Sequence, residues 1–493
     1  MLDRLARALR TDHPDRPAVL RHTRTGAVRP LIRRGDLADL ADGYAAALHA
    51  RGLGPGTTLG VAVRPGPRAL AVMLAAHRLG LRIAVLDPTS GPDVLTARLA
   101  LARPDLVLAD AAAQAVAGWA GPFARRADLA LPRLTTLGPV ATLGRRLPGC
   151  APRLRPAGAA PPTTAGPGPD GSRGDAVIVF TSGTTARPRA VVHTREGLAA
   201  GLRTVADLVA PRAGTVVLGG TFFVLVPALA AGAAVVLPAR SPVALARQLA
   251  RLAPADTYLT PPQLRAALAA GARCTGRVWT GSAPADAGLL RRVKESGAHQ
   301  AWSVYALTEL FPAAAVEEAE KSAREGDGDL VGAPLPGVRA RLADDGELLL
   351  TGPGARHRYL GEEPETWVRT GDRAALDPDG RIVLAGRLKD MVLRRAENIY
   401  PGLYEPALHV PGVELAVLVG VPAEDGDERL VALVQPTPGA DPRRLRTALR
   451  GPLDRMGSAR PDAVLFGTVP LSGRSRKPDR TAASAHCAEE LNR

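Results

Sequence analysis

Cysteine is scarce in this sequence, with only Cys150, Cys274 and Cys487 among 493 residues. The three lie far apart and no Cys-x-x-Cys pair occurs, so neither a disulfide framework nor a zinc site is expected. The first ten residues also lack the apolar core of a secretory signal peptide. These absences favour a reducing compartment, and we expect the protein in the cytoplasm.

Aromatic residues are also few, at 3% of the chain, although hydrophobic residues of all kinds make up 46%. Alanine, leucine and valine must therefore fill the interior. No internal repeat of about 20–50 residues stands out. The chain is too long for one ordinary core and is expected to form more than one domain.

Acidic residues are outnumbered, with 48 Asp and Glu against 63 Lys and Arg, which gives a formal net charge of +15. Such a balance can indicate a nucleic-acid or acidic-membrane partner. Nearly all the cations are arginines scattered along the chain, however, and tight clusters such as Arg33-Arg34 are short. We attribute the charge to composition and expect no nucleic-acid partner.

Residues 213–239 carry no charge, and this run is long enough to span a bilayer. Glycines and Pro227 interrupt it, and Ala-Val-Val-Leu at 234–237 is typical of a buried strand. We expect a buried helix–turn–strand unit here, and no integral membrane segment.

Strands and helices alternate in the first part of the chain. Residues 60–63 and 83–86 are short apolar runs without polar alternation, typical of strands covered on both faces. Between them we expect a helix after Pro67, and before them a helix that Asp36 caps. Residues 337–385 change to short strands with Asp-Gly turns, typical of antiparallel sheet or a small barrel. After about residue 390 the pattern predicts a small α+β unit.

A loop of hydroxyls, glycine and cations follows the apolar run 176–180 and reads Thr-Ser-Gly-Thr-Thr-Ala-Arg-Pro-Arg from Thr181 to Arg189. Hydroxyls and exposed backbone N–H groups can donate to phosphate oxygens, and a nearby guanidinium can neutralise them. The spacing is not that of a Walker A loop. Taken alone, the segment fits a polar surface loop as well as a phosphate site.

The loop is the first of several motifs that occur in one order along the chain. The others are Gly281–Pro284, Tyr305–Glu309, Arg369–Asp372, Gly386–Asp390 and Glu397–Pro401. In this order they resemble the motifs of the acyl-adenylate-forming (AMP-binding) enzymes, which include the acyl-CoA synthetases. The resemblance covers the whole chain and implies an α/β fold. A large N-terminal domain of doubly wound parallel sheets plus a small barrel, residues 1–388, would precede a smaller mobile α+β C-terminal lid domain, residues 389–493.

The resemblance implies that ATP and Mg²⁺ bind at these motifs. Phosphate-loop and adenine-turn residues would be Thr181, Ser182, Gly183, Thr184, Thr185, Ser282, Ala283 and Pro284. Tyr305 offers a flat face for adenine, and Asp372 can accept hydrogen bonds from both ribose hydroxyls. Arg387 can reach the ribose or phosphate side. Thr308 can donate to the α-phosphate, Glu309 is a hard oxygen ligand for Mg²⁺, and Arg189 supplies charge.

Lysine provides a separate indication because the chain holds only four: Lys294, Lys321, Lys389 and Lys477. The resemblance makes Lys389 the hinge between domains. It makes Lys477, in the segment 470–480, the cation that bridges the substrate carboxylate and the α-phosphate, a task that suits a compact ammonium. The glycine usual before this lysine is missing, so Arg476 is a rival for the role, and chance placement is the alternative.

Departures from the family pattern leave open which group accepts the acyl group from acyl-AMP. Ala186 and Arg189 replace a glycine and a lysine, and Arg395-Ala396 replaces a glycine pair that opens a path for the pantetheine thiol. We expect acyl-AMP formation followed by transfer to CoA. The alternatives are transfer to a carrier-protein thiol, closure of a β-lactone, or a nucleotide-binding homologue without catalysis.

The acid itself is expected to be apolar or aromatic. The acyl pocket should lie around Phe222, Phe223, Trp279 and Trp302. An aspartate that could hold an amino group has no clear counterpart near Phe222, which argues against an amino-acid substrate.

Overall fold

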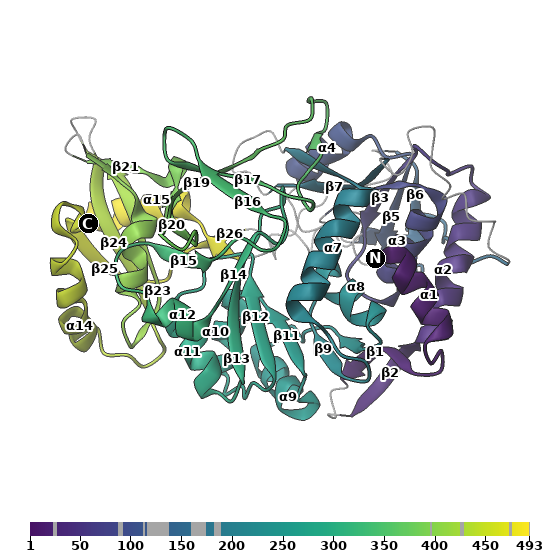
Figure 1. Cartoon of the computed structure of the whole chain (residues 1–493), viewed down its shortest axis with the longest axis horizontal. Coiled ribbons are helices and arrows are strands. Elements are labelled where there is room, and N and C mark those ends of the chain that lie inside the picture. Colours follow the sequence, from purple (N-terminus) through teal and green to yellow (C-terminus); the bar gives the residue numbers. More distant parts are fainter. Residues whose placement is uncertain are drawn as a thin grey trace.

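The computed structural model describes residues 1–22, 27–86, 92–111, 114–115, 138–158, 174–181, 189–394, 397–423, 428–472 and 476–492. Two large sheets, a smaller antiparallel sheet and a C-terminal α+β unit are arranged along the long axis of the molecule, with helices α1–α3 at one end and the C-terminal unit at the other (Figure 1). The α/β class, with a large N-terminal part and a smaller C-terminal unit, is as predicted.

The first sheet has eight strands and is mostly parallel. Its order is β14 (Ala314–Glu317), β13 (Gln300–Tyr305), β12 (Arg277–Gly281), β11 (Asp256–Leu259), β9 (Val216–Leu218), β10 (Ala234–Val236), β1 (Pro17–His22) and β2 (Val28–Arg33). Only the two edge strands, β14 and β2, run antiparallel to their neighbours.

The second sheet has seven strands. Its order is β18 (Arg358–Tyr359), β8 (Ala190–Thr194), β7 (Asp175–Phe180), β4 (Arg82–Val85), β3 (Thr58–Ala62), β5 (Leu106–Asp110) and β6 (Val140–Leu143). The strands from β7 to β6 are parallel, and β8 and β18 are antiparallel. This matches the parallel, covered sheet expected from the unalternating apolar runs.

Helices cover and join the two sheets. In chain order they are α1 (Leu2–Thr11), α2 (Arg34–His49), α3 (Pro67–Leu79), α4 (Pro92–Ala102), α7 (Arg195–Val209), α8 (Phe222–Ala230), α9 (Pro242–Leu252), α10 (Pro261–Ala269), α11 (Ala287–Glu295) and α12 (Glu318–Ala323). One core cluster contains Leu59 and Leu108 of the second sheet and Val217 and Val235 of the first. Burial of apolar surface therefore ties the sheets together.

Helix starts follow local chemistry, with one correction. Thr194 caps α7 by accepting a 3.1 Å hydrogen bond from the N–H of Gly197. Asp36 was predicted to cap α2, but this helix begins at Arg34 and Asp36 lies in its first turn. The guanidinium of Arg34 is buried and donates to three backbone carbonyls, which fixes the earlier start. The run 213–239 forms β9, α8 and β10, the helix–turn–strand unit expected, and none of the described helices is both long and apolar enough to cross a membrane.

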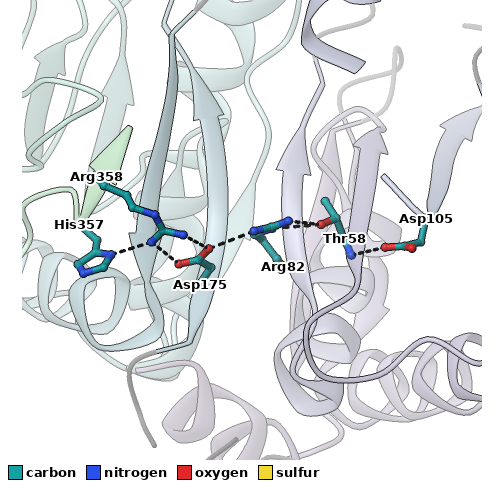
Figure 2. Close-up of polar contacts among 6 residues, drawn as sticks. All are labelled: Thr58, Arg82, Asp105, Asp175, His357 and Arg358. Atoms are coloured by element: carbon teal, nitrogen blue, oxygen red, sulfur yellow. Dashed lines mark hydrogen bonds and ion pairs between the residues drawn. The ribbon is translucent and has the colours of Figure 1, made fainter. Parts of the chain in front are cut away.

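A polar network ties strands of the second sheet together at Asp175, the first residue of β7 (Figure 2). Arg358 of β18 donates to both carboxylate oxygens, at 2.9 and 2.8 Å. Arg82 of β4 donates to the same carboxylate at 3.1 Å and to the hydroxyl of Thr58 at 2.8 Å. The backbone N–H of Thr58 in turn donates to Asp105. Four strands and the loop before β5 are thus joined by charge-assisted hydrogen bonds.

The rest of the chain forms the antiparallel parts. A five-stranded sheet has the order β15 (Asp329–Gly332), β20 (Ile382–Arg387), β19 (Val368–Leu376), β17 (Glu347–Thr351) and β16 (Arg339–Leu342). Beyond the short 3₁₀ helix Leu388–Asp390, the C-terminal unit contains β23 (Val413–Pro422), β24 (Glu428–Pro436), β25 (Ala463–Phe466), α14 (Pro442–Asp454) and α15 (Arg480–Leu491). The domain boundary at 388/389 stays a prediction.

The C-terminal unit contacts the N-terminal part closely. Gly386 has φ 127° and lies against Gly402, where a side chain on either residue would meet backbone atoms at about 3 Å or less. Arg373 lies 4.6 Å from the ring centre of Tyr400. These contacts join the C-terminal unit to β19 and β20 of the five-stranded sheet.

Candidate active site

A cleft of about 2170 Å³ lies between the N-terminal part and the C-terminal unit. Most of the predicted site residues line it: Thr181, Arg189, Ser282, Ala283, Pro284, Tyr305, Thr308, Glu309, Asp372, Arg387, Lys389 and Lys477. The predicted loop residues Ser182, Gly183, Thr184 and Thr185 lie outside the described residues, as do Ala186 and the Arg395-Ala396 pair. A second hollow of about 510 Å³, lined by arginines such as Arg68 and Arg153, contains none of the predicted residues.

Asp372 is the centre of a charged cluster in this cleft. Its residue is only 4% exposed, and strand register places it opposite Arg387. The guanidinium Nε of Arg387 lies 2.6 Å from Oδ1, and the hydroxyl of Tyr305 donates to Oδ2 at 2.5 Å. Burial raises the pKa of Asp372, although Arg387, Tyr305 and Lys477 oppose this shift. A carboxylate has about four acceptor sites, so roughly two remain for a ligand's hydroxyl groups.

The same arrangement fixes the position and the protonation of Tyr305. It is the last residue of β13, and burial together with the Asp372 charge raises its pKa well above the ordinary value. The phenol therefore stays protonated and acts as the donor to Asp372. This hydrogen bond fixes the ring within the cleft lining.

Glu309 is held by a tyrosine between two arginines. The hydroxyl of Tyr359 donates to Oε1 of Glu309 at 3.0 Å. The ring of Tyr359 lies 4.7 Å from the guanidinium carbon of Arg189 and 4.3 Å from that of Arg356. Each cation–π contact adds roughly 0.5–1 kcal/mol or more when partly desolvated. The aromatic ring thus positions both the carboxylate and Arg189.

Among the described residues, the donors at this point suit a magnesium ion that binds together with a phosphate ligand. No group of three or more His, Cys, Asp or Glu side chains able to hold a metal occurs in the described part of the chain. Glu309 offers one carboxylate at this point of the cleft. Mg²⁺ is commonly bound by one or two carboxylates plus substrate phosphates and water, and this donor set fits Mg²⁺ entering with ATP.

Thr308 is anchored through its backbone. His193 of β8 lies with Nε2 2.8 Å from the carbonyl oxygen of Thr308. Burial lowers the pKa of His193, so the ring is neutral and Nε2–H is the donor. The carbonyl of the next residue, Glu309, accepts a hydrogen bond from the N–H of Arg356 at 2.6 Å. The Thr308–Glu309 peptide is thus fixed from two elements.

Lys477 enters the cleft from the C-terminal unit. It begins the short strand β27 (Lys477–Pro478), which pairs with β26 (Leu471–Ser472). Although the residue retains solvent exposure, desolvation of its ammonium lowers the pKa of Lys477. The charges of Arg387 and Lys389 act in the same direction, and those of Asp372 and Glu309 oppose it. Lys477 is therefore close to the groups that the sequence assigned to ATP.

Arg480 fixes the chain next to Lys477. Its guanidinium donates to both oxygens of Glu405 at 2.7 Å and to the carbonyl of Leu418 at 2.8 Å. It also lies 3.1 Å from the carboxylate of Asp390, the residue after Lys389. The rival cation Arg476 also lines the cleft and, like Lys477, is exposed. It has φ 49°, an unfavourable backbone conformation for a non-glycine residue.

The part of the cleft where the acyl pocket was expected is aromatic. Phe223 packs edge-on against Tyr258, with ring centres 5.6 Å apart, and Tyr258 shares a 3.0 Å hydrogen bond with Ser282. Trp279 also lines the cleft. Trp302 does not, because it stacks on Trp279 at 5.3 Å, outside the lining. The expectation that Trp302 lines the acyl pocket is therefore wrong.

Two site residues escaped the sequence analysis: His193 and Tyr359. Arg480 ends the predicted segment 470–480, but no role was assigned to it from the sequence. Each of the three contacts a segment that is distant in sequence, and no local pattern reports such a contact. One signal was available. The chain has only six tyrosines, and Tyr359 follows the basic run Arg356-His357-Arg358, an unusual place for an aromatic residue.

A family model described as AMP-binding enzyme matches residues 7–362. A probable nonribosomal peptide synthetase, CymA, from Salinispora arenicola is 29% identical over 446 residues, which is 82% of this chain and 5% of the synthetase. Indoleacetate–CoA ligase from Aromatoleum aromaticum is 28% identical over 62% of this chain and 66% of the ligase. The matches thus span less than two thirds of either relative. The amide bond synthetase McbA from Marinactinospora thermotolerans superposes with a TM-score of 0.77 at 23% identity over 99% of both chains, a likeness of fold.

Proposed function

The chain belongs to the AMP-binding enzyme family of adenylate-forming ligases, and we propose that it joins a carboxylic acid to CoA in two steps. In the first step, a carboxylate oxygen attacks the α-phosphorus of MgATP. The bond from that phosphorus to the bridging oxygen breaks, and acyl-AMP and pyrophosphate are released. In the second step, the CoA sulfur attacks the acyl carbon, AMP leaves, and the thiol proton passes to solvent.

One observation carries the proposal. Asp372 of the five-stranded sheet, Glu309 after β13 and Lys477 of the C-terminal unit come from distant segments yet line one cleft. Phosphoryl and nucleotidyl transfers depend mainly on positioning and on electrostatic stabilisation of the transferring oxygens. A carboxylate for ribose, a carboxylate for Mg²⁺ and an ammonium for the α-phosphate are the groups this reaction requires.

The individual roles follow from contacts within the cleft. Asp372, fixed by Arg387 and Tyr305, would accept the ribose hydroxyls with its remaining acceptor sites. Glu309, oriented by Tyr359, would bind Mg²⁺ between the phosphates. Lys477 would bridge the acid's carboxylate and the α-phosphate, and Arg189 would offset phosphate charge with the hydroxyls of Thr181 and its loop.

The second step would transfer the acyl group from AMP to CoA. The C-terminal unit would rotate about Lys389 after adenylation and withdraw Lys477. The bonds from Arg480 to Asp390 and Glu405 support this, since they join the Lys477 segment to the hinge side so that both would move together. The CoA ligase relative supports CoA as the acceptor. A carrier-protein thiol, β-lactone closure or nucleotide binding without catalysis are the competing outcomes.

An acceptor assay tests the thiol directly. Purified protein, MgATP and an activated acid are incubated with free CoA or with a pantetheinylated carrier protein, and thioester is measured by mass spectrometry. Thioester with free CoA supports the proposal. Thioester with the carrier protein alone would assign the acceptor to the carrier, and acid-dependent ATP–pyrophosphate exchange without any thioester would limit the activity to acyl-AMP formation.

A further inference from the structure

One face of the seven-stranded sheet is partly accessible although its strands are central. Five aliphatic side chains of β3, β4 and β7 share this face: Val61, Ile83, Val85, Val177 and Val179. Strand register aligns them, since Val61 pairs with Val85, Val85 with Val179, and Ile83 with Val177. All five are only partly buried and line the cleft. On the opposite face of β7, Ile178 is fully buried.

Helices form the facing wall of this space. Helices α3, α7 and α8 contribute apolar side chains to the lining: Val72, Met73, Leu198, Leu202, Val205, Val209, Phe222, Phe223 and Val226. On α7, Leu198, Leu202, Val205 and Val209 follow one another at steps of four, three and four, which places them on one helix face, and Leu208 beside them also lines the cleft. From Leu198 to Val209 this stripe is about 16 Å long at 1.5 Å per residue.

This space, the sheet-side chamber, adjoins the reaction site. His193 pairs with Val177 in the sheet and lines the same cleft, and it is bonded to the Thr308 carbonyl. Phe311, which packs against His193 with ring centres 5.4 Å apart, also lines the cleft. The lining of this one cleft therefore extends from the Thr308 peptide, past His193 and Phe311, to the apolar walls.

The whole cleft, which includes the proposed ATP site as well as the sheet-side chamber, is larger than an ordinary small-ligand pocket. Such pockets hold about 300–1,000 Å³, against about 2170 Å³ here. The ionisable groups that also reach the lining near these walls include His77, bonded to Asp3 at 2.9 Å, and Arg195 at the start of α7. The five sheet residues and the α7 stripe offer no polar group that would bind a second charged ligand.

We propose that the sheet-side chamber receives the tail of an extended aliphatic acyl substrate, of about ten or more carbons, whose carboxylate lies at Thr308 and Lys477. An extended chain advances roughly 1.2 Å per bond, so the 16 Å stripe corresponds to about 13 bonds. This inference rests on the proposed acid activation and names its substrate class.

The test is ATP–pyrophosphate exchange with butanoate, octanoate, dodecanoate and benzoate, since exchange does not depend on the acceptor. Each buried methylene should raise kcat/KM about two- to fourfold from butanoate to dodecanoate. Two variants, Val177→Phe on the sheet and Leu198→Phe on α7, place a ring in the chamber from opposite walls. Each should lower kcat/KM for dodecanoate more than about tenfold and leave that for butanoate within about twofold. Val243→Phe, at an exposed position on α9, is the matched control and should leave kcat/KM unchanged for both acids.

A variant that keeps its exchange activity with butanoate is folded. Loss of activity with dodecanoate alone therefore supports the chamber. Activity that does not rise with chain length, or variants that lower both acids equally, would overturn the inference while leaving acid activation standing. Exchange with none of the acids would overturn the proposed function as well.

Discussion

Nε2 of His193 lies 2.8 Å from the backbone carbonyl oxygen of Thr308. This hydrogen bond connects β8, which follows the predicted phosphate loop, to the peptide that carries Thr308 and Glu309. Two motifs that lie more than a hundred residues apart in sequence are therefore held in a fixed relation. Because burial lowers the pKa of His193, the ring is a neutral donor at neutral pH.

His193→Leu should lower kcat for adenylation about tenfold, because the buried carbonyl of Thr308 loses a hydrogen bond that contributes about 1–1.5 kcal/mol. His193→Gln, which keeps an N–H donor of similar reach, should recover part of the rate. Steady-state pyrophosphate release measures both. A leucine variant with wild-type kcat would show that the histidine only packs against Phe311.

Asp372→Asn should raise the KM for ATP about 30-fold or more, since hydrogen bonds to charged groups contribute about 1.5–3 kcal/mol each. The wild-type enzyme should discriminate against 2′-deoxy-ATP, and the variant should lose most of that discrimination. Comparing the two nucleotides on both proteins isolates the contact with the ribose. Equal discrimination before and after the change would place the ribose elsewhere in the cleft.

We expect the adenylation rate to fall at alkaline pH, because Lys477 loses its charge there. Desolvation and the nearby Arg387 lower its pKa, so the ammonium is lost at a lower pH than for an ordinary lysine. The rate should therefore fall as pH rises through this lowered pKa. In Lys477→Arg the guanidinium stays charged, so the residual activity should continue to higher pH. If the rate of that variant falls at the same alkaline pH as the wild type, the titrating group is not Lys477.

Asp175 should make the fold sensitive to acid. Burial alone would raise its pKa, but the hydrogen bonds and charges of Arg358 and Arg82 lower it. A lowered pKa in the folded state gives stability that is present above the unfolded value, near 3.9, and lost as pH falls through the folded pKa. Asp175→Asn should reduce the free energy of unfolding at neutral pH by about 1–3 kcal/mol and flatten its decline below pH 5. Urea unfolding at several pH values measures this, and a variant with the wild-type acid profile would contradict it.

The fold class and the gathering of most predicted residues in one cleft were predictable from sequence because each motif is local. Unalternating apolar runs predicted the parallel strands, and the ordered motifs placed Tyr305, Glu309, Asp372, Arg387 and Lys477 in one site. The start of α2 was not predictable, because Arg34 is fixed by carbonyls of α1 and α8. Trp302 was misplaced because composition cannot report whether an aromatic residue faces a cleft or a neighbouring ring. Loop residues 182–185 lie outside the described part of the chain, so their role stays a prediction.

The most direct test of acid activation is acid-dependent ATP–pyrophosphate exchange by the wild-type protein beside Lys477→Ala and Arg476→Ala. We expect exchange that requires both MgATP and a carboxylic acid. Exchange should fall at least about 100-fold in Lys477→Ala, as for loss of a charged group that contacts the transferring oxygens, and stay within about twofold in Arg476→Ala. A protein that binds ATP but exchanges with no acid would contradict acid activation, and loss of exchange in Arg476→Ala with an active Lys477→Ala would contradict the assigned cation.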